Sequence, residues 1–332
     1  MKLPQTSLEA NHLPVMIKEV IKLCSPYIGG NFMDCTFGGG GYSRELLKHK
    51  NTKIIALDRD SNVIQIANQI KKNYKLRFRF FNKKFSNLDQ ITKIKYDAII
   101  FDLGLSSIQL DNLSRGFSFK SKSELNMSMG LTSTKAKEVL NTLSEDKLKK
   151  IIKHFGEEKD ASKIAHNITK ERNIKELRTT DQLANIIKNS KKKNYEKIDK
   201  STKTFQAIRI FVNKEITELI EGIINATKIL KPGGKLIVIS FHSIEDKIVK
   251  YLFKNYSRNQ SRTNKYLPDI KLKNTILFEN YRNKIIKASK KEVKNNPRSR
   301  SAKLRYAIRS SEQFKDPLEL RLKFKHLTNL ER

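Results

Sequence analysis

The sequence predicts an α/β fold: a doubly wound parallel sheet that is interrupted by a small inserted helical domain. Three observations predict it. A short apolar run that ends at Asp34 is followed by four glycines, Gly38 to Gly41, and then by a helical pattern. Apolar runs typical of buried strands alternate with helical patterns as far as residue 102 and resume at 235–240. Between them, residues 133–188 carry helical patterns without a strand candidate.

The first two strands, 31–35 and 53–57, frame a candidate ligand site. Glycines let a ligand approach the main chain closely, and the helix start behind them offers unpaired N–H groups. Asp58 follows the second strand, twenty residues after Gly38, where a carboxylate can bind both hydroxyls of a ribose. A flexible turn in an ordinary α/β domain remains open. Because Ser43 replaces the last glycine of G-x-G-x-x-G, the pattern favours a ligand without pyrophosphate, and S-adenosylmethionine fits.

Two further strands, 77–81 and 96–101, complete the first half of the sheet. Phe85 follows the third strand, where its ring could cover an adenine or pack in the core, and spacing leaves both open. Asp102 ends the fourth strand. Since ligands of such sheets bind beyond the carboxyl ends of the strands, the glycines, Asp58, Phe85 and Asp102 are expected on one edge. Helices are expected in this half at 13–23, 44–50 and 61–72.

After Asp102 the alternation stops. Residues 103–130 are rich in Ser and Gly without a period, which is typical of a functional or disordered loop. The predicted domains are 1–110, a helical insertion at 111–203 that would recognise the substrate, and 204–332 with a basic C-terminal region. The later expected elements are four helices between 133 and 187, a basic loop at 188–200, one long helix at 204–230, a strand at 235–240, a helix at 244–254 and a closing edge strand at 303–308.

The composition favours a polyanionic partner. The formal net charge is +34, from 68 Lys+Arg against 34 Asp+Glu. AT-rich coding sequence would also enrich lysine, so the distribution matters. Residues 251–310 hold 17 Lys+Arg and 3 Asp+Glu, interleaved with Tyr251, Tyr256, Tyr266 and Tyr281, which is more typical of a nucleic-acid surface than of bias.

The chain shows no sign of export or of structural metal. The N-terminus, MKLPQTSLEANHLP, is too polar for a signal peptide, and no stretch approaches the apolar length of a membrane helix. The two cysteines, Cys24 and Cys35, have neither disulfide nor metal-ligand spacing. We therefore expect a cytoplasmic protein without a metal site.

Several motifs together resemble the ribosomal RNA small subunit methyltransferase H family over about residues 12–309. They are DCTFGGGGYS (34–43), ALDRD (56–60), FDLGLSSIQLD (101–111), RGFSF (115–119), FGEE (155–158), TFQAIRIFVN (204–213), LKPGG (230–234), SFHSIED (240–246) and NPRSRSAKLR (296–305). The resemblance implies a Rossmann-like methyltransferase sheet and methyl transfer from S-adenosylmethionine to N4 of a cytidine in the decoding region of small-subunit (16S) ribosomal RNA. The cofactor contacts that it implies are Gly40, Gly41, Tyr42, Asp58, Phe85, Asp102 and Gln109.

The sequence departs from the family pattern at one place. The family usually carries an L-D-M-R-M-D-like run after RGFSF, whereas residues 125–130 read LNMSMG. Two acidic positions and one arginine are thereby lost, at Asn126, Ser128 and Gly130. A role of charge at these positions, in catalysis or in RNA docking, is in doubt for this chain.

Asp102 is the first candidate for a catalytic group. The cytosine N4 lone pair is delocalised into the ring, so a carboxylate that accepts the amine N–H would localise it in the transition state. A purely cofactor-binding role for Asp102 remains open. Asn126, Ser106 and His242 are weaker candidates, and His242 could shuttle a proton or only fix the strand end.

Three hypotheses remain at this point. The first is an RNA methyltransferase, and the second is an RNA-binding assembly factor with a vestigial pocket. The third, a nicotinamide oxidoreductase, is disfavoured by the missing dinucleotide motif and by the basic charge. Free RNA and an assembled small subunit both remain open as substrates, and so does a homodimer.

Overall fold

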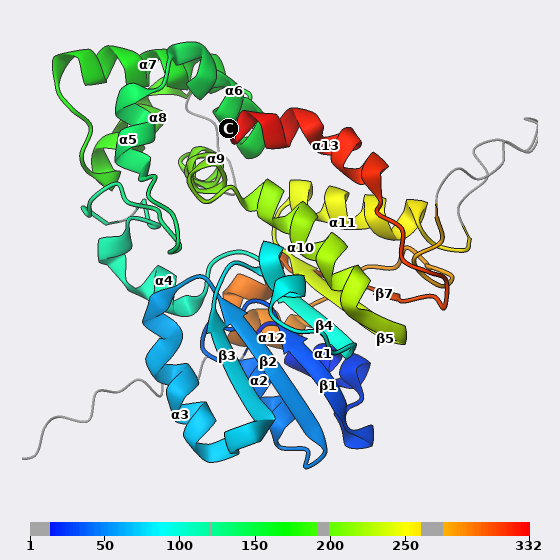
Figure 1. Ribbon diagram of the computed structural model, residues 1–332. Helices are drawn as coiled ribbons and strands as arrows, with labels where there is room; N and C mark the ends of the chain where they lie inside the picture. The colour runs from blue at the N-terminus through cyan, green and yellow to red at the C-terminus, as the bar shows by residue number, and fades with distance from the viewer. Residues whose placement is uncertain (1–13, 120, 192–198, 260–274) are drawn as a thin grey trace, which may run out of the picture.

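The computed structural model describes residues 14–119, 121–191, 199–259 and 275–332, and it contains one seven-stranded sheet with the strand order β3-β2-β1-β4-β5-β7-β6 (Figure 1). The strands are β1 (Gly30–Asp34), β2 (Thr52–Asp58), β3 (Phe78–Asn82), β4 (Tyr96–Asp102), β5 (Leu230–Ser240), β6 (Ile286–Lys287) and β7 (Lys303–Ile308). Neighbouring strands from β3 to β5 are parallel, which confirms the predicted fold class. The predicted edge position of β7 was wrong, because β7 pairs antiparallel with both β5 and β6.

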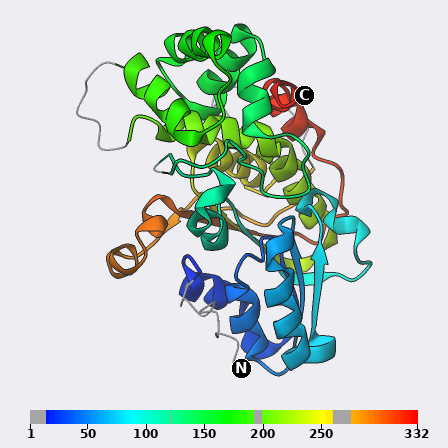
Figure 2. The ribbon, with the colours of Figure 1, turned by 90° about the vertical axis from the view of Figure 1, so that its left-hand side faces the viewer.

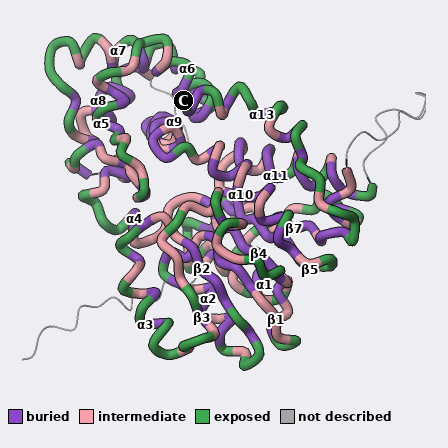
Figure 3. The backbone as a smooth tube through the Cα atoms, in the orientation of Figure 1, coloured by how far each residue is buried: buried purple, intermediate pink, exposed green. Residues whose placement is uncertain are grey.

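Helices cover both faces of the sheet because its central strands are apolar on both sides. In β4, Ala98 and Ile100 belong to one buried cluster, whereas Ile99 and Phe101 belong to the other. The first cluster is covered by α1 (Ile17–Cys24), α2 (Gly41–Leu47) and α3 (Ile64–Tyr74). The second is covered by η4 (Phe85–Gln90), α10 (Glu215–Ile229) and α11 (Ser243–Asn255). Figure 3 shows the central strands as almost continuously buried.

Helices follow β4 and form a separate layer above the carboxyl edge of the sheet (Figures 1 and 2). Their apolar faces join the cluster that covers the Phe101 side of the sheet, so the insertion and the sheet share one core. Several of these helices begin at a residue whose side chain caps the N-terminus. Ser144 accepts a hydrogen bond from Lys147 N and thereby caps α6. These helices are α4 (Ser107–Asp111), α5 (Ala136–Thr142), α6 (Glu145–Gly156), α7 (Ala161–Ile174), α8 (Thr180–Ser190) and α9 (Thr202–Asn213).

The expected single helix over 204–230 was wrong. The chain breaks into α9 and α10 at Lys214, which has φ 52°. The Asn213 side chain explains the position of the break, because its amide accepts a hydrogen bond from Met129 N and donates one to Met127 O, each at 2.8 Å. The first N–H groups of α10 are bound by the Glu331 carboxylate, 2.9 Å from both Ile216 N and Thr217 N.

The segment 103–130, which the sequence leaves as a functional or disordered loop, is ordered wherever the structure describes it. It contains α4, and Leu125, Met127 and Met129 are buried in the shared core. Beyond β5, the chain adds α12 (Lys290–Asn295) beside the sheet edge and α13 (Leu318–Leu330) across α10 and α11. Tyr266 and most of the basic loop 188–200 lie outside the described residues.

Over the described ranges, none of the helices has both the length and the apolar character needed to cross a bilayer.

Candidate active site at the carboxyl edge of the sheet

The glycine loop connects β1 to α2 and contacts the tip of β2. Gly38 N donates a hydrogen bond of 2.8 Å to Asp58 Oδ2. Gly39 is exposed, and a Cβ there would meet nothing within 4 Å. Gly40 and Gly41 are needed for packing instead, since a Cβ would lie 2.8 Å from the Phe37 ring at Gly40 and 2.3 Å from Pro14 at Gly41. The open side of the loop is therefore at Gly39, next to the predicted contacts Gly40 and Gly41.

Asp34, at the end of β1, binds both ends of the glycine loop through hydrogen bonds from Thr36 N and from the Ser43 hydroxyl. Its side chain is fully buried, and Ser43 Oγ in α2 donates a hydrogen bond of 2.7 Å to its Oδ2. Burial raises the pKa of Asp34 to about 6. Asp34 is not among the predicted site residues, although its position directly before the glycine loop indicates such a role.

Asp58 lies at the tip of β2, as the sequence predicts. Besides the Gly38 contact, its Oδ1 accepts a hydrogen bond of 2.9 Å from Asp60 N. Burial raises the pKa of Asp58 to about 6, against the lowering effect of these two N–H groups. The carboxylate is thus fixed in orientation before any ligand binds.

Asp102, at the end of β4, carries the most perturbed carboxyl group of this edge. Its Oδ1 is buried without a hydrogen-bond partner. Burial raises the pKa of Asp102 to about 8, and the charges of Asp34, Glu245 and Glu292 act in the same direction. Burial therefore favours the protonated form of Asp102 at neutral pH.

Tyr42 is the nearest polar neighbour of Asp102. Its hydroxyl lies 2.5 Å from Val15 O and 3.2 Å from Asp102 Oδ2. The hydroxyl is the donor in both contacts, and the shorter one to Val15 O is the stronger. The hydrogen bond from Tyr42 lowers the pKa of Asp102, but the larger effect of burial raises it. Tyr42 is buried, so its phenol ring forms a wall of the site behind the loop.

Phe85 and Gln109 occupy positions within the protein framework at the same edge. The Phe85 ring stands edge-on to Phe101 at 5.3 Å between centroids, and a Cβ at Gly222 of α10 would lie 2.5 Å from it. Gln109 accepts a hydrogen bond from Ser106 N and donates one to Asp60 Oδ2, both at 3.0 Å. Its amide thus caps α4 and ties that helix to the tip of β2.

Ser106 and the segment 125–130 adjoin this network. The Ser106 side chain caps α4 and faces the loop, since a Cβ at Gly38 would lie 3.4 Å from its own Cβ. Arg115, which pairs with Asp60, also donates a hydrogen bond of 2.7 Å to Ser128 O. Asn126 Oδ1 accepts a hydrogen bond from Ser128 N at 3.1 Å.

Gly130 is packed directly against the tip of β2. Arg59 Nε donates a hydrogen bond of 2.9 Å to Gly130 O. Gly130 has φ +101°, and a Cβ there would lie 2.4 Å from Arg59 O. No side chain fits this conformation, so the backbone of the segment is adapted to the glycine that replaces the expected acidic residue.

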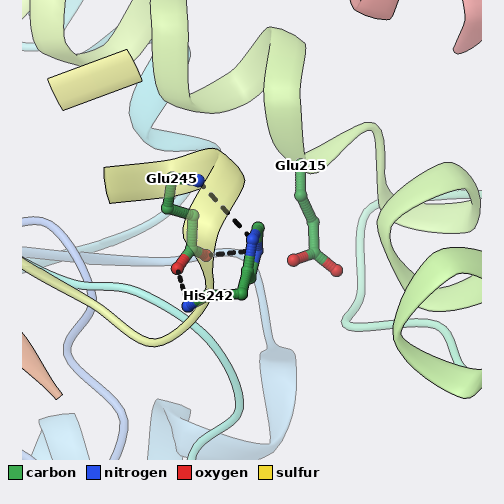
Figure 4. A group of neighbouring side chains, drawn as sticks. All are labelled: Glu215, His242 and Glu245. Atoms are coloured by element: carbon green, nitrogen blue, oxygen red, sulfur yellow. Dashed lines mark hydrogen bonds and ion pairs between the residues drawn. The ribbon is translucent and has the colours of Figure 1, made fainter. Parts of the chain in front are cut away.

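His242 belongs to a charged cluster at the end of β5 (Figure 4). Its Nε2 lies 3.0 Å from Glu245 Oε1, and its Nδ1 accepts a hydrogen bond from Glu245 N at 3.5 Å. Arg209 of α9 binds both oxygens of Glu215 at 2.9 Å. The cluster therefore joins α9 and the start of α10 to the end of β5, beside the site.

The ligand-type atoms of Glu215, His242 and Glu245 lie within 4.8 Å of one another, as in a cation site. The charges nevertheless pair internally. Arg209 occupies both oxygens of Glu215, and the acceptor role of Nδ1 leaves the proton on Nε2, facing Glu245. Of this cluster only His242 is among the predicted candidates; Glu245, three residues after the N-cap His242, fits a capping box and could have been predicted from the sequence.

The residues of this edge fit a nucleoside cofactor with a cationic centre. Gly39 borders open space, Asp58 presents an oriented carboxylate, and the buried Oδ1 of Asp102 has no partner. A positive charge near Asp102 would stabilise its ionised form. S-adenosylmethionine combines a ribose with a sulfonium and so suits this set.

Comparison with known proteins gives consistent matches along the chain. The model of the MraW methylase family matches residues 9–310. The chain is 43% identical to the ribosomal RNA small subunit methyltransferase H of Rickettsia canadensis (strain McKiel), over 90% of this chain and 98% of that protein. It is 44% identical to the protein of the same name from Orientia tsutsugamushi (strain Boryong), over 91% and 99%. Among solved structures, an rRNA methylase from Streptococcus thermophilus covers 89% of this chain and 96% of its own at 11% identity, with a TM-score of 0.41.

Proposed function

Because the chain belongs to the MraW methylase family, we propose that it methylates N4 of a cytidine in the decoding region of small-subunit (16S) ribosomal RNA. The protein is a methyltransferase, and its cofactor is S-adenosylmethionine. The observation that carries the proposal is the unpartnered, buried Oδ1 of Asp102 at the edge formed by the glycine loop and Asp58. Because the chain belongs to a methyltransferase family, the nicotinamide oxidoreductase hypothesis is rejected.

Most residues of this edge are assigned to cofactor binding, and Asp102 is assigned to catalysis. The glycine loop around Gly40 and Gly41 and the buried Tyr42 form the wall against the cofactor, and Asp58 binds its ribose. Phe85 borders the adenine side, with Gln109 holding α4 in place. When bound, S-adenosylmethionine supplies an activated methyl group.

Asp102 is the proposed catalytic group. Once ionised, its Oδ1 can accept the N–H of the cytosine amine and so localise the nitrogen lone pair during transfer. The raised pKa of Asp102 is compatible with this role, since a nearby sulfonium favours ionisation. Ser106, Asn126 and His242 are not needed for this step, because their described contacts serve helix caps and the 125–130 segment.

We assign substrate recognition to the helical insertion at 111–203, with 1–110 and 204–332 forming the methyltransferase domain around it. The relatives are named for ribosomal RNA of the small subunit, and we propose the assembled small subunit, in the cytoplasm, as the physiological partner. A homodimer remains part of the partner hypothesis and is testable by analytical ultracentrifugation.

Methyl transfer to purified small subunits tests the proposal directly. Subunits from a strain that lacks the activity would be incubated with the protein and radiolabelled S-adenosylmethionine, and the RNA would then be digested to nucleosides. Label in N4-methylcytidine is expected. Label in another nucleoside would overturn the target assignment.

A second function is favoured by one specific observation, the altered segment 125–130. An RNA-binding assembly factor with a vestigial pocket would bind subunits and transfer no methyl group. Absence of label with S-adenosylmethionine binding intact would favour this function.

A further inference from the structure

The segment 282–300 forms a basic arm beside the site. It contains eight Lys+Arg and one acidic residue, Glu292. It includes β6, α12 and the turn that precedes β7. Figure 2 shows this orange segment projecting from the body, between the helical insertion and the α1 end of the sheet domain. The cations of the arm therefore lie away from the main body of the protein.

The cations of the arm are exposed, and most have no partner in the part of the chain that the structure describes. The side chains of Lys287, Lys290, Lys291, Lys294 and Arg300 are exposed and make no hydrogen bond or ion pair with the described residues. Holding several like charges close together without counter-charges is unfavourable in the free protein. A polyanion that binds there would relieve this repulsion and release its own counterions.

Two contacts fix the arm to the site. On one side, Glu292 Oε1 accepts a hydrogen bond of 2.6 Å from Met16 N, next to Val15, whose carbonyl binds Tyr42. On the other side, Arg298 donates hydrogen bonds to Ser107 Oγ and to Asp111 Oδ1, at 2.7 and 2.8 Å. Both of the latter belong to α4, the helix that the Gln109 amide ties to the tip of β2. The arm thus bridges the two sides of the carboxyl edge.

We propose that the basic arm binds the phosphate backbone of the RNA strand next to the target nucleotide. The inference rests on the proposed function and names a surface that holds its substrate. Lysine side chains recognise phosphate as point charges without reading sequence, which suits the positioning of a strand while the base enters the site. Glu292 and Arg298 act as anchors, so the free cations of α12, Lys290, Lys291 and Lys294, are the contacts to test.

The test is a triple variant, Lys290→Gln with Lys291→Gln and Lys294→Gln, in the full chain. Glutamine has nearly the helix propensity of lysine, so α12 is preserved. Affinity for a 20-nucleotide single-stranded RNA would be measured by fluorescence anisotropy over a salt series. With a slope of about −0.7 per phosphate contact, loss of three contacts should weaken binding about 100-fold at 0.1 M salt and reduce the log–log slope by about 2. Affinity for S-adenosylmethionine, measured by calorimetry, should not change.

A matched control separates position from total charge. Lys71→Gln, Lys72→Gln and Lys75→Gln remove three equally exposed cations around the end of α3, at the opposite edge of the sheet. An equal loss in this control, or unchanged RNA affinity of the arm variant, would overturn the proposal. Unchanged affinity for naked RNA with weaker binding to small subunits would also overturn it and would indicate an acidic protein segment instead. Both binding assays remain decisive if the wild-type protein transfers no methyl group, so the two proposals fail separately.

Discussion

At the scale of single residues, the site is defined by carboxyl groups whose burial opposes their charge. Asp34, Asp58 and Asp102 end three neighbouring strands, and burial raises the pKa of each. Parallel strands bring their carboxyl ends to one edge, so the sequence predicts that Asp58 and Asp102 lie near the glycines. The raised pKa values could not be predicted, because burial of these carboxyl groups arises from long-range packing that exists only in the folded chain.

Asp58→Ala should weaken S-adenosylmethionine binding about 10- to 100-fold. Each charge-assisted hydrogen bond to a ribose hydroxyl contributes about 1.5–3 kcal/mol, which sets this range. Isothermal titration calorimetry measures the effect. Asp97→Ala serves as a control, since Asp97 also accepts a backbone N–H, from Asn31 at 2.7 Å, but at the amino end of the sheet. Unchanged affinity in Asp58→Ala would refute the ribose assignment.

The raised pKa of Asp102 predicts different pH dependences for S-adenosylmethionine and for its uncharged product, S-adenosylhomocysteine. At pH 6 the carboxyl group is protonated and does not attract the sulfonium; above a pKa of about 8 it is ionised and does. The preference for S-adenosylmethionine over S-adenosylhomocysteine should therefore rise about 10-fold from pH 6 to pH 8.5.

Calorimetry with both ligands at each pH provides the measurement. Asp58 affects both ligands alike through the ribose, so the ratio of the two dissociation constants isolates the sulfonium. Asp102→Asn should abolish the change in this ratio. A ratio that stays constant with pH in the wild-type protein would place the sulfonium away from Asp102.

At the scale of elements, the backbone of the segment 125–130 is adapted to the loss of the charged residues of the family motif. Leu125, Met127 and Met129 keep the apolar positions of the expected run and are buried. Gly130 instead lets the chain pass against Arg59 O with φ +101°. The sequence reveals the loss of charge but not this contact, which joins residues 71 positions apart.

Gly130→Ala should destabilise the protein by about 2–3 kcal/mol, lowering the melting temperature by several degrees. The reason is twofold: a left-handed backbone and a Cβ that would lie 2.4 Å from Arg59 O. Differential scanning calorimetry measures the shift. Gly233→Ala is the matched control, because it has φ +79° but open space around the position of its Cβ. Equal shifts in both variants would mean that the contact with Arg59 contributes nothing.

The break between α9 and α10 marks the limit of periodicity as a predictor. Apolar positions continue in register from Phe205 to Ile223, so the pattern favours one helix. The turn at Lys214 is fixed instead by long-range contacts, of Asn213 with the 127–129 backbone and of Glu331 with the first N–H groups of α10. Neither partner is visible to a local pattern.

At the scale of the whole molecule, the sequence predicts an interrupted sheet, and the structure adds the way in which the interruption is held. Periodicity identifies the apolar face of each inserted helix but not the surface that it packs against. That surface is continuous with the Phe101 side of the sheet: Phe155 of α6 and Ile208 of α9 share a buried cluster with Phe101 and Leu219. The charged pair of Arg209 and Glu215 reinforces the same junction.

A shared core predicts that the sheet and the helical insertion unfold together. Phe155 is fully buried in α6, far in sequence from the strands, and Phe155→Ala should cost about 3–5 kcal/mol. If the core is one cooperative unit, this variant lowers the melting temperature of the entire protein, and the calorimetric and van't Hoff enthalpies remain equal. S-adenosylmethionine, whose proposed site lies at the sheet edge, should then raise the same single transition in both proteins by mass action. Two transitions, of which the ligand shifts only one, would mean that the insertion folds independently and that the contacts between α6, α9 and the sheet are too weak to couple substrate recognition to the cofactor edge.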